Sequence, residues 1–256
     1  MHNTVLIRGK LFDKTPLVIS SIRKWFNGEI ILSTWKHEDI DKYRKDVDKV
    51  ILTEDPGEGP VQQFKRQLVS YNEGINHSTG VKTLVIRTDI ICNSDVFEIH
   101  DQIQQKPKEN FKLFNNKVLI GNMMTIDPDI GVVGEPVYSR YFRICDWFQC
   151  GYTEDIIKFS KVISEVDKIK NTILCTEQLW YLILIKQNLF NNLNIDKFEQ
   201  ILSFNWDIML NNFIVYNTKT KLNIENFNWN FQPEFLHGYI TEEKFNLKHE
   251  QHYKLK

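Results

Sequence analysis

The sequence has few cysteines, and their spacing argues against two kinds of stabilised domain. The 256 residues include four cysteines, and no two of them form a CxxC pair. A disulfide scaffold or a structural zinc site would normally show such a spacing pattern. We therefore expect reduced thiols and a cytoplasmic location.

The sequence also lacks a charge excess and a long apolar run. Its formal net charge is −1, whereas a dedicated nucleic-acid binder usually carries a basic excess. No run approaches the length of a membrane-spanning helix, and the first residues lack the features of a secretory signal. Hydrophobic residues make up 42% of the chain, enough for a packed core. We expect a globular protein without a nucleic-acid partner.

Several common motifs of nucleotide and hydrolytic sites are missing. The sequence contains no GxxxxGKS or GxxxxGKT, and no GxGxxG follows a predicted strand. It has no GxSxG nucleophile elbow. The seven histidines are scattered and form no HExxH pattern. These absences argue against a phosphate-loop enzyme, a dinucleotide-binding enzyme, an α/β-hydrolase and a zinc protease.

Short apolar runs alternate with helical patterns through the first 90 residues. Such alternation favours an α/β fold with a mainly parallel central sheet and helices on both faces. Right-handed crossovers would bring the carboxyl ends of the strands to one rim. The predicted strands are 5–7, 29–34, 49–53 and 81–87, and the predicted helices are 16–26, 38–45 and 61–75. Thr15 before Pro16 suits a helix cap.

The rest of the chain is predicted to complete one domain. We divide it into a nucleotide-binding half (1–98), an acceptor or catalytic half (99–190) and a carboxyl-terminal helical or irregular appendage (191–256). Strands are predicted at 118–120 and 141–147, with an irregular stretch over 122–136. Helices are predicted to begin at Thr153, as a cap, and near Thr176.

Polar residues follow the predicted strands and suit a nucleotide-phosphate site at the rim. Arg8-Gly9 would let the backbone approach a ligand closely, because glycine has no Cβ. Thr34 offers a hydroxyl, Asp55 could accept hydrogen bonds from a base or ribose, and Arg66 has a fork of donors for a diphosphate.

The triplet Arg87-Thr88-Asp89 stands at the carboxyl end of the predicted strand 81–87. Its aspartate could face a cation or a phosphate at the rim, since ligands of open α/β sheets bind beyond the carboxyl ends of the strands. Each of these residues also suits a structural role. Asp55 before Pro-Gly is a good turn residue, and Arg66 suits a solvated helix face.

Several segments, in this order, resemble the WavE-type lipopolysaccharide-synthesis family. The likeness covers about residues 5–185, and its StW and RTD segments are the most specific. The segments are Gly28-Glu29-Ile30-Ile31-Leu32-Ser33-Thr34-Trp35, Thr53-Glu54-Asp55-Pro56-Gly57, Arg66-Gln67 with Ser70, Ile86-Arg87-Thr88-Asp89, Cys145-Asp146-Trp147 with Gly151, and Thr176-Glu177-Gln178.

The resemblance implies a GT-A-like glycosyltransferase that takes a nucleotide-activated sugar, with a UDP-sugar favoured, to a carbohydrate or glycolipid acceptor. Asp89 would stand where such enzymes hold Mn²⁺ or Mg²⁺. The triplet departs from the usual DxD, so a second oxygen ligand would have to come from Asp95. Arg87 would help to neutralise the leaving diphosphate, and Asp146 or Glu177 would deprotonate the acceptor hydroxyl.

Two other functions stay open at this point. The chain could be a non-catalytic module that binds nucleotide or glycan, or a phosphotransferase that acts on surface glycan. Peripheral contact with the inner face of the membrane through the aromatic carboxyl-terminal region is a further expectation, although no amphipathic basic helix supports it. The aromatic residues of that region are Trp206, Phe213, Trp229, Phe231 and Phe235. The sequence gives no prediction of oligomeric state.

Overall fold

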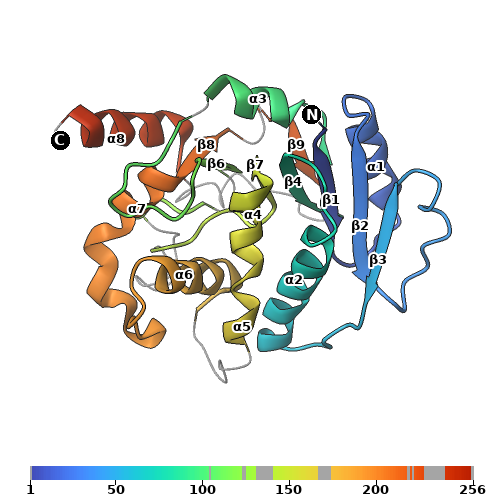
Figure 1. The fold of residues 1–256 in the computed structure, drawn as a ribbon, viewed down its shortest axis with the longest axis horizontal. Helices are drawn as coiled ribbons and strands as arrows, with labels where there is room; N and C mark the ends of the chain where they lie inside the picture. The colour runs from blue at the N-terminus through green and yellow to red at the C-terminus, as the bar shows by residue number, and fades with distance from the viewer. Residues whose placement is uncertain are drawn as a thin grey trace.

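The computed structural model describes most of the chain around one central sheet (Figure 1). The described residues are 2–103, 105–122, 125–130, 141–166, 174–217, 220, 222–227 and 240–254. The sheet has seven strands in the order β3-β2-β1-β4-β7-β6-β8. Its strands are β1 (Thr4–Arg8), β2 (Glu29–Trp35), β3 (Lys49–Thr53), β4 (Lys82–Arg87), β6 (Val118–Gly121), β7 (Phe148–Tyr152) and β8 (Phe213–Tyr216).

Only β7 runs against its neighbours among these seven strands. It is antiparallel to β4 and β6, while every other neighbouring pair is parallel. A separate two-stranded sheet pairs β5 (Ile90–Cys92) with β9 (Ile224–Asn226) in antiparallel register. The prediction of an α/β fold with a mainly parallel sheet is confirmed.

Helices flank the sheet on both faces. Helix α1 connects β1 to β2, and helix α2 connects β3 to β4, which lies on the other side of β1 in the sheet. Because the two connections run in opposite directions across the sheet, right-handed crossovers place the two helices on opposite faces. The helices are α1 (Thr15–Arg23), α2 (Pro60–Ile75), α3 (Val96–Ile103), α4 (Thr153–Ser160), α5 (Ile163–Val166), α6 (Thr176–Asn188), the 3-10 segment η2 (Ile195–Phe204), α7 (Asn205–Asn212) and α8 (Glu242–Lys254). No helix in the described ranges combines the length and apolar character needed to cross a bilayer.

Helix α2 packs closely on strands β1 and β2. Its apolar residues Phe64, Leu68, Tyr71 and Ile75, at helical spacing, are buried. The approach is close because Gly74 has no side chain: a Cβ there would lie 2.3 Å from a methyl carbon of Leu6. This packing fixes the polar face of α2 beside the carboxyl ends of the strands.

The structure corrects two predicted elements. Residues 38–45 form bends and turns instead of a helix, with hydrogen bonds between residues three apart, such as Tyr43 N–H to the Ile40 carbonyl (2.9 Å). Residues 141–147 are not a strand, and pairing with β4 begins only at Phe148, which lies opposite Ile86.

Both predicted threonine caps are also corrected. Helix α1 begins at Thr15, and helix α4 begins at Thr153, so each threonine lies inside its helix. The Thr15 hydroxyl donates to the Thr88 carbonyl (3.1 Å), and the Thr153 hydroxyl donates to the Gly80 carbonyl (2.6 Å). Each hydroxyl therefore ties its helix to a distant loop.

The carboxyl-terminal region does more than form an appendage. Alongside η2, α7 and α8 it supplies β8, which pairs in parallel with β6 inside the sheet, and β9 of the small sheet. Phe213 is fully buried in β8, and the Trp206 indole donates to Asp129 (3.0 Å). Trp229, Phe231 and Phe235, like residues 131–136 of the expected irregular stretch, lie outside the described residues.

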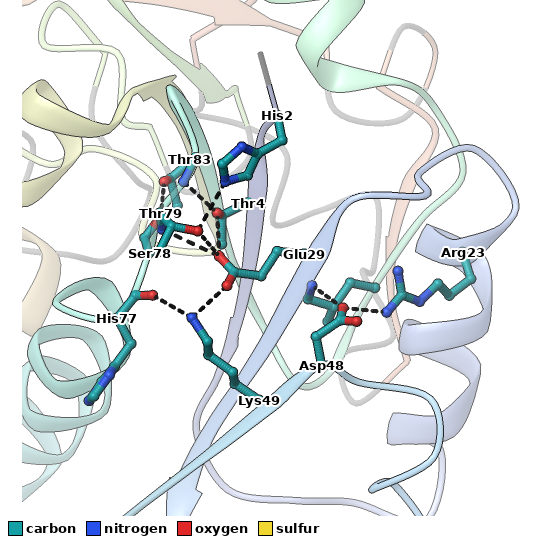
Figure 2. A network of polar contacts seen from close by, with 12 residues as sticks. His2, Thr4, Arg23, Glu29, Asp48, Lys49, His77, Ser78, Thr79 and Thr83 are labelled. Atoms are coloured by element: carbon teal, nitrogen blue, oxygen red, sulfur yellow. Dashed lines mark hydrogen bonds and ion pairs between the residues drawn. The ribbon is translucent and has the colours of Figure 1, made fainter.

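A polar network closes the amino ends of the parallel strands (Figure 2). At its centre the Glu29 carboxylate accepts hydrogen bonds from Thr4 (2.7 Å) and Thr79, and pairs with Lys49 (2.6 Å). Partial burial alone would raise the pKa of Glu29, but the bonds from Lys49, Thr4 and Thr79 outweigh burial and lower it. The network therefore joins β1, β2, β3 and the turn before β4 at the end opposite the rim.

Glu29→Gln should lower the free energy of unfolding by about 1–2 kcal/mol at neutral pH, because the charged acceptor of this network is lost. The wild-type contribution is complete above the ordinary pKa of 4.5 and is lost as pH falls through the lowered pKa of the folded state. Urea unfolding at pH 7 and near pH 3 measures the difference, with exposed Glu199→Gln as control. A gap between Glu29→Gln and wild type that is unchanged at pH 3 would contradict this assignment.

Candidate functional site

A cavity opens at the carboxyl ends of β1, β2 and β4. Its volume is about 170 Å³. The rim of the sheet forms its floor, and the polar face of α2 forms one wall. The lining residues are Arg8, Gly9, Lys10, Phe12, Trp35, Gln63, Arg66, Gln67, Ser70, Arg87, Thr88 and Asp89. The structure thus brings together five of the predicted site residues: Arg8, Gly9, Arg66, Arg87 and Asp89.

Two arginines end neighbouring strands and lie side by side. Arg8 in β1 and Arg87 in β4 are register partners, and Ser33 in β2 is the partner of Arg8 on its other side. Partners in parallel strands direct their side chains to the same face of the sheet. Gly9 follows Arg8 with φ +116°, a conformation that favours glycine, and its N–H donates to the Ser33 carbonyl (3.0 Å).

Arg8 is buried beside two aromatic rings, Tyr71 and Trp180, which contact each other edge to face with their centres 5.1 Å apart. It is 2% exposed, and its guanidinium carbon lies 5.5 Å from the Tyr71 ring centre and 5.4 Å from that of Trp180. It donates to the Asp146 carbonyl (2.9 Å), while its Nε–H has no acceptor among the described residues. Burial lowers the pKa of Arg8 to about 10, so the group stays cationic at neutral pH.

Arg87 joins two buried carboxylates. It donates to both oxygens of Asp89, at 3.0 and 2.8 Å, and its Nη1 lies 3.6 Å from Asp146. The side chains of the two aspartates are 3% and 2% exposed. Burial would lower the pKa of Arg87, but Asp146 and Asp89 outweigh burial and raise it. Asn226 of β9 also donates to Asp89 (3.3 Å).

Asp146 and Glu177 lie close enough to interact electrostatically beside Arg87. Burial raises the pKa of Glu177, the negative charge of Asp146 raises it further, and Arg143 opposes the shift. Neither carboxylate oxygen of Asp146 accepts a hydrogen bond from a described residue. Asp146 precedes an antiparallel strand, and the amino end of that strand lies at the same rim as the carboxyl ends of its neighbours. The direction of β7 therefore explains how Asp146, one of the two alternative bases, reaches this rim.

Asp55 and Arg66 form an ion pair at the edge of the cavity. Arg66 donates to Asp55 (2.6 Å), and Asp55 also accepts from the Gly57 N–H (3.0 Å). Arg66 lies over the Trp35 ring, with 5.7 Å from its guanidinium carbon to the ring centre. Asp55 therefore acts on the cavity through Arg66, since Arg66 lines it and Asp55 does not.

The structure places Thr34 and Asp95 outside the cavity. Successive side chains of β2 alternate between faces, so Ser33 and Trp35 share the face of α2 and Thr34 points to the other. Asp95 precedes α3, where its Oδ1 accepts from the N–H groups of Phe97 (3.0 Å) and Glu98 (3.1 Å).

The described residues do not fit a divalent cation at Asp89. Such a cation needs several oxygen ligands, but the Asp89 carboxylate is bound by the Arg87 fork, and Asp95 lies elsewhere. No group of three or more potential metal ligands occurs in the part of the chain that the structure describes. The expectation of Mn²⁺ or Mg²⁺ stays a prediction, and no step below depends on it.

Sequence reasoning missed several residues of the site. Trp35 could have been found, because it shares the face of Ser33 at a spacing of two. Gln67 lies four residues from Gln63 on the polar face of α2. It also belongs to the Arg66-Gln67 segment of the family resemblance, which does not by itself predict a role for it. Tyr71, Trp180 and Asn226 carry no local signal, since tertiary packing alone brings them to Arg8 and Asp89.

Residues 8–224 match the protein-family model of WavE lipopolysaccharide synthesis. This match spans most of the chain and includes every site residue above except Asn226. The chain belongs to the WavE lipopolysaccharide synthesis family. Its predicted membership, made from the StW and RTD segments, is confirmed. No curated protein matches the sequence.

Solved structures resemble this WavE-family chain only distantly. HddC from Yersinia pseudotuberculosis aligns with 98% of this chain and 100% of its own, at 12% identity and a TM-score of 0.39. A glycosyltransferase involved in glycosylation of the major capsid of PBCV-1 aligns with 86% of this chain and 85% of its own, at 9% identity and 0.41. The glycosyltransferase GlyE of Streptococcus pneumoniae TIGR4 aligns with 97% of this chain and 60% of its own, at 12% identity and 0.47. Scores this low carry no argument about function.

Arg87→Met should lower the free energy of unfolding by about 3–5 kcal/mol, because it leaves two buried carboxylates without their cation. Arg44→Met is the matched control, since Arg44 makes only an exposed pair with Asp41. The triple change Arg87→Met, Asp89→Asn, Asp146→Asn should recover much of the loss. Chemical denaturation measures all three, and an Arg87→Met variant as stable as wild type would contradict the central role of these ion pairs.

Proposed function

We propose that this protein is a GT-A-like glycosyltransferase, which moves a sugar from a nucleoside-diphosphate donor to a hydroxyl of a surface glycan in lipopolysaccharide synthesis. Membership of the WavE family supports the process. The observation that carries the reaction is the meeting of Arg8 and Arg87 with Asp146 and Glu177 at one rim. The protein would act in the cytoplasm, at the inner face of the membrane where such acceptors are built.

The two arginines suit a diphosphate leaving group. Negative charge grows on the diphosphate as the sugar bond breaks, and preorganised cations stabilise that charge most where water is excluded. Arg8 is buried beside the Tyr71 and Trp180 rings and stays cationic at neutral pH, so its charge is already in place before the donor binds. Arg87 is fixed by Asp89, which sets the direction of its remaining donors.

Glu177 is the better candidate for the base that deprotonates the acceptor hydroxyl. A general base works best when its pKa lies near the operating pH, and the pKa of Glu177 is raised toward that range by burial and by Asp146. Asp146 pairs with Arg87 at 3.6 Å and therefore has a positioning role, which includes raising the pKa of Glu177.

In this proposal, arginine side chains neutralise the charge of the leaving diphosphate, the role for which Mn²⁺ or Mg²⁺ was expected. The proposal rests on the Arg87 guanidinium, which binds Asp89 and lies 3.6 Å from Asp146. A cation at Asp89 would have to displace this guanidinium.

Incubation with a panel of nucleotide-sugars and glycan acceptors tests the reaction by its product. Release of a nucleoside diphosphate supports glycosyl transfer, release of a monophosphate indicates a phosphotransferase, and binding without release indicates a non-catalytic module. Glu177→Gln should lower turnover by about 10²- to 10⁴-fold while leaving nucleotide affinity intact. Glu199→Gln is the control, and full turnover in Glu177→Gln would remove Glu177 from the mechanism.

The pH profile should separate the two acids. Turnover should rise with pH through the raised pKa of Glu177, because only the ionised carboxylate accepts a proton. Asp146→Asn removes a neighbouring negative charge, so the acid limb of the profile should move to lower pH in that variant. An acid limb that stays in place would show that Asp146 does not act on Glu177.

Treatment with EDTA should leave most of the activity, because Arg8 and Arg87 neutralise the diphosphate. Turnover of a fixed nucleotide-sugar, measured before and after chelation and after return of Mn²⁺ or Mg²⁺, checks this expectation. Loss on chelation with recovery on Mn²⁺ would instead establish the cation that the resemblance to metal-dependent enzymes implies.

A further inference from the structure

Several buried polar atoms that make no hydrogen bond to a described residue lie at or beside the cavity. Among the described residues, those at or beside it are Arg8 Nε, Ser33 Oγ, Trp35 Nε1, Gln67 Oε1 and both carboxylate oxygens of Asp146. A buried polar group that stays unpaired costs about 1–3 kcal/mol, so native proteins keep few of them. A site in which several lie together is built to receive hydrogen bonds from a ligand.

The polar face of α2 presents one such group, Gln67. The face comprises Gln63, Arg66, Gln67 and Ser70, at helical spacing. Arg66 is bound to Asp55, and the Ser70 hydroxyl donates to the Arg66 carbonyl (2.9 Å). Gln67 makes no side-chain hydrogen bond in the described part of the chain, and its amide oxygen is buried.

The chemistry of Gln67 and Trp35 differs from that of the arginine end of the cavity. Arg8 and Arg87 offer donors alone and suit phosphate oxygens. The Gln67 carboxamide offers an acceptor beside a donor, which suits a base edge and not a phosphate. The Trp35 side chain is buried, lines the same cavity, and contributes one indole N–H without an acceptor.

We propose that Gln67 and Trp35 recognise the imide edge of a uracil ring by hydrogen bonds. This inference rests on the nucleotide-sugar function proposed above. Uracil presents a carbonyl, the N3–H and a second carbonyl in a row. The Trp35 N–H donates to one carbonyl, the Gln67 oxygen accepts from N3–H, and the Gln67 amide donates to the other carbonyl. Cytosine and adenine have no ring N–H on this edge. Guanine has one, but its 2-amino group would face a donor in either orientation, the Gln67 amide or the Trp35 N–H.

Calorimetric binding of UDP, N3-methyl-UDP, GDP and CDP to the whole protein tests the assignment. Wild type should prefer UDP to GDP and CDP, and methylation of N3 should weaken binding by roughly 10-fold or more, since the Gln67 oxygen loses its donor. Gln67→Ala should bind UDP less tightly and should no longer distinguish UDP from N3-methyl-UDP. Exposed Gln200→Ala is the control and should keep the discrimination.

The outcomes separate this inference from the proposed function. Equal affinity of wild type for UDP and N3-methyl-UDP, or a preference for CDP, would overturn base reading by Gln67 while leaving a nucleotide site in place. Failure to bind any of the four nucleotides would overturn both. Because the methylated ligand is tested on the wild-type protein, the result does not depend on whether a variant folds.

Discussion

The ion pairs of Arg87 with Asp89 and Asp146 are the constraint on which the site depends. They connect the end of the central strand β4 to the segment before β7, and both carboxylates are almost fully buried. Buried carboxylates persist only when they are paired, so the positions of the three side chains are fixed together. Arg8, which lies beside Tyr71 and Trp180, adds a second cation, and the charge of Asp146 opposes the effect of burial on its pKa.

The direction of β7 explains how two parts of the chain meet at one edge. If every strand of the sheet were parallel, each residue at the rim would come from a segment that follows a strand in the sequence. Because β7 is antiparallel to β4, the residues that precede it lie at the same rim, and Asp146 comes from there. The Trp147 carbonyl accepts from the Arg87 N–H (3.2 Å), which ties this segment directly to the triplet. The segment before β7 thus lies against the end of β4, where this bond continues the β4–β7 ladder toward the rim.

The sequence was sufficient to predict what depends on local periodicity. Strands β1 to β4, helix α2 and the parallel topology follow from apolar runs and helical spacing, and the rim follows from the handedness of the crossovers. The sequence was insufficient where the pairing of strands determines which residues belong to the sheet and which face they occupy. Residues 141–147 are as apolar as a strand, but Phe148 is the first residue opposite β4. Thr34 and Trp35 were equally close to the rim in sequence, and only the pleat shows which of them faces α2. Asp95 looked like a returning ligand but caps α3.

The distribution of unpaired groups separates the part of the rim that is built for stability from the part built for a ligand. Asp89 has its hydrogen bonds from Arg87 and Asn226, and Asp55 has its bonds from Arg66 and Gly57. Those acids hold cationic side chains in place. Among the described residues, Arg8 Nε, Trp35 Nε1 and Gln67 Oε1 at the cavity make no hydrogen bond. A fold optimised for stability alone would not leave these three atoms together. In the proposed nucleotide site, the carboxylates orient the arginines and the three unpaired atoms await the ligand, so binding of that ligand would add to the stability of the folded protein.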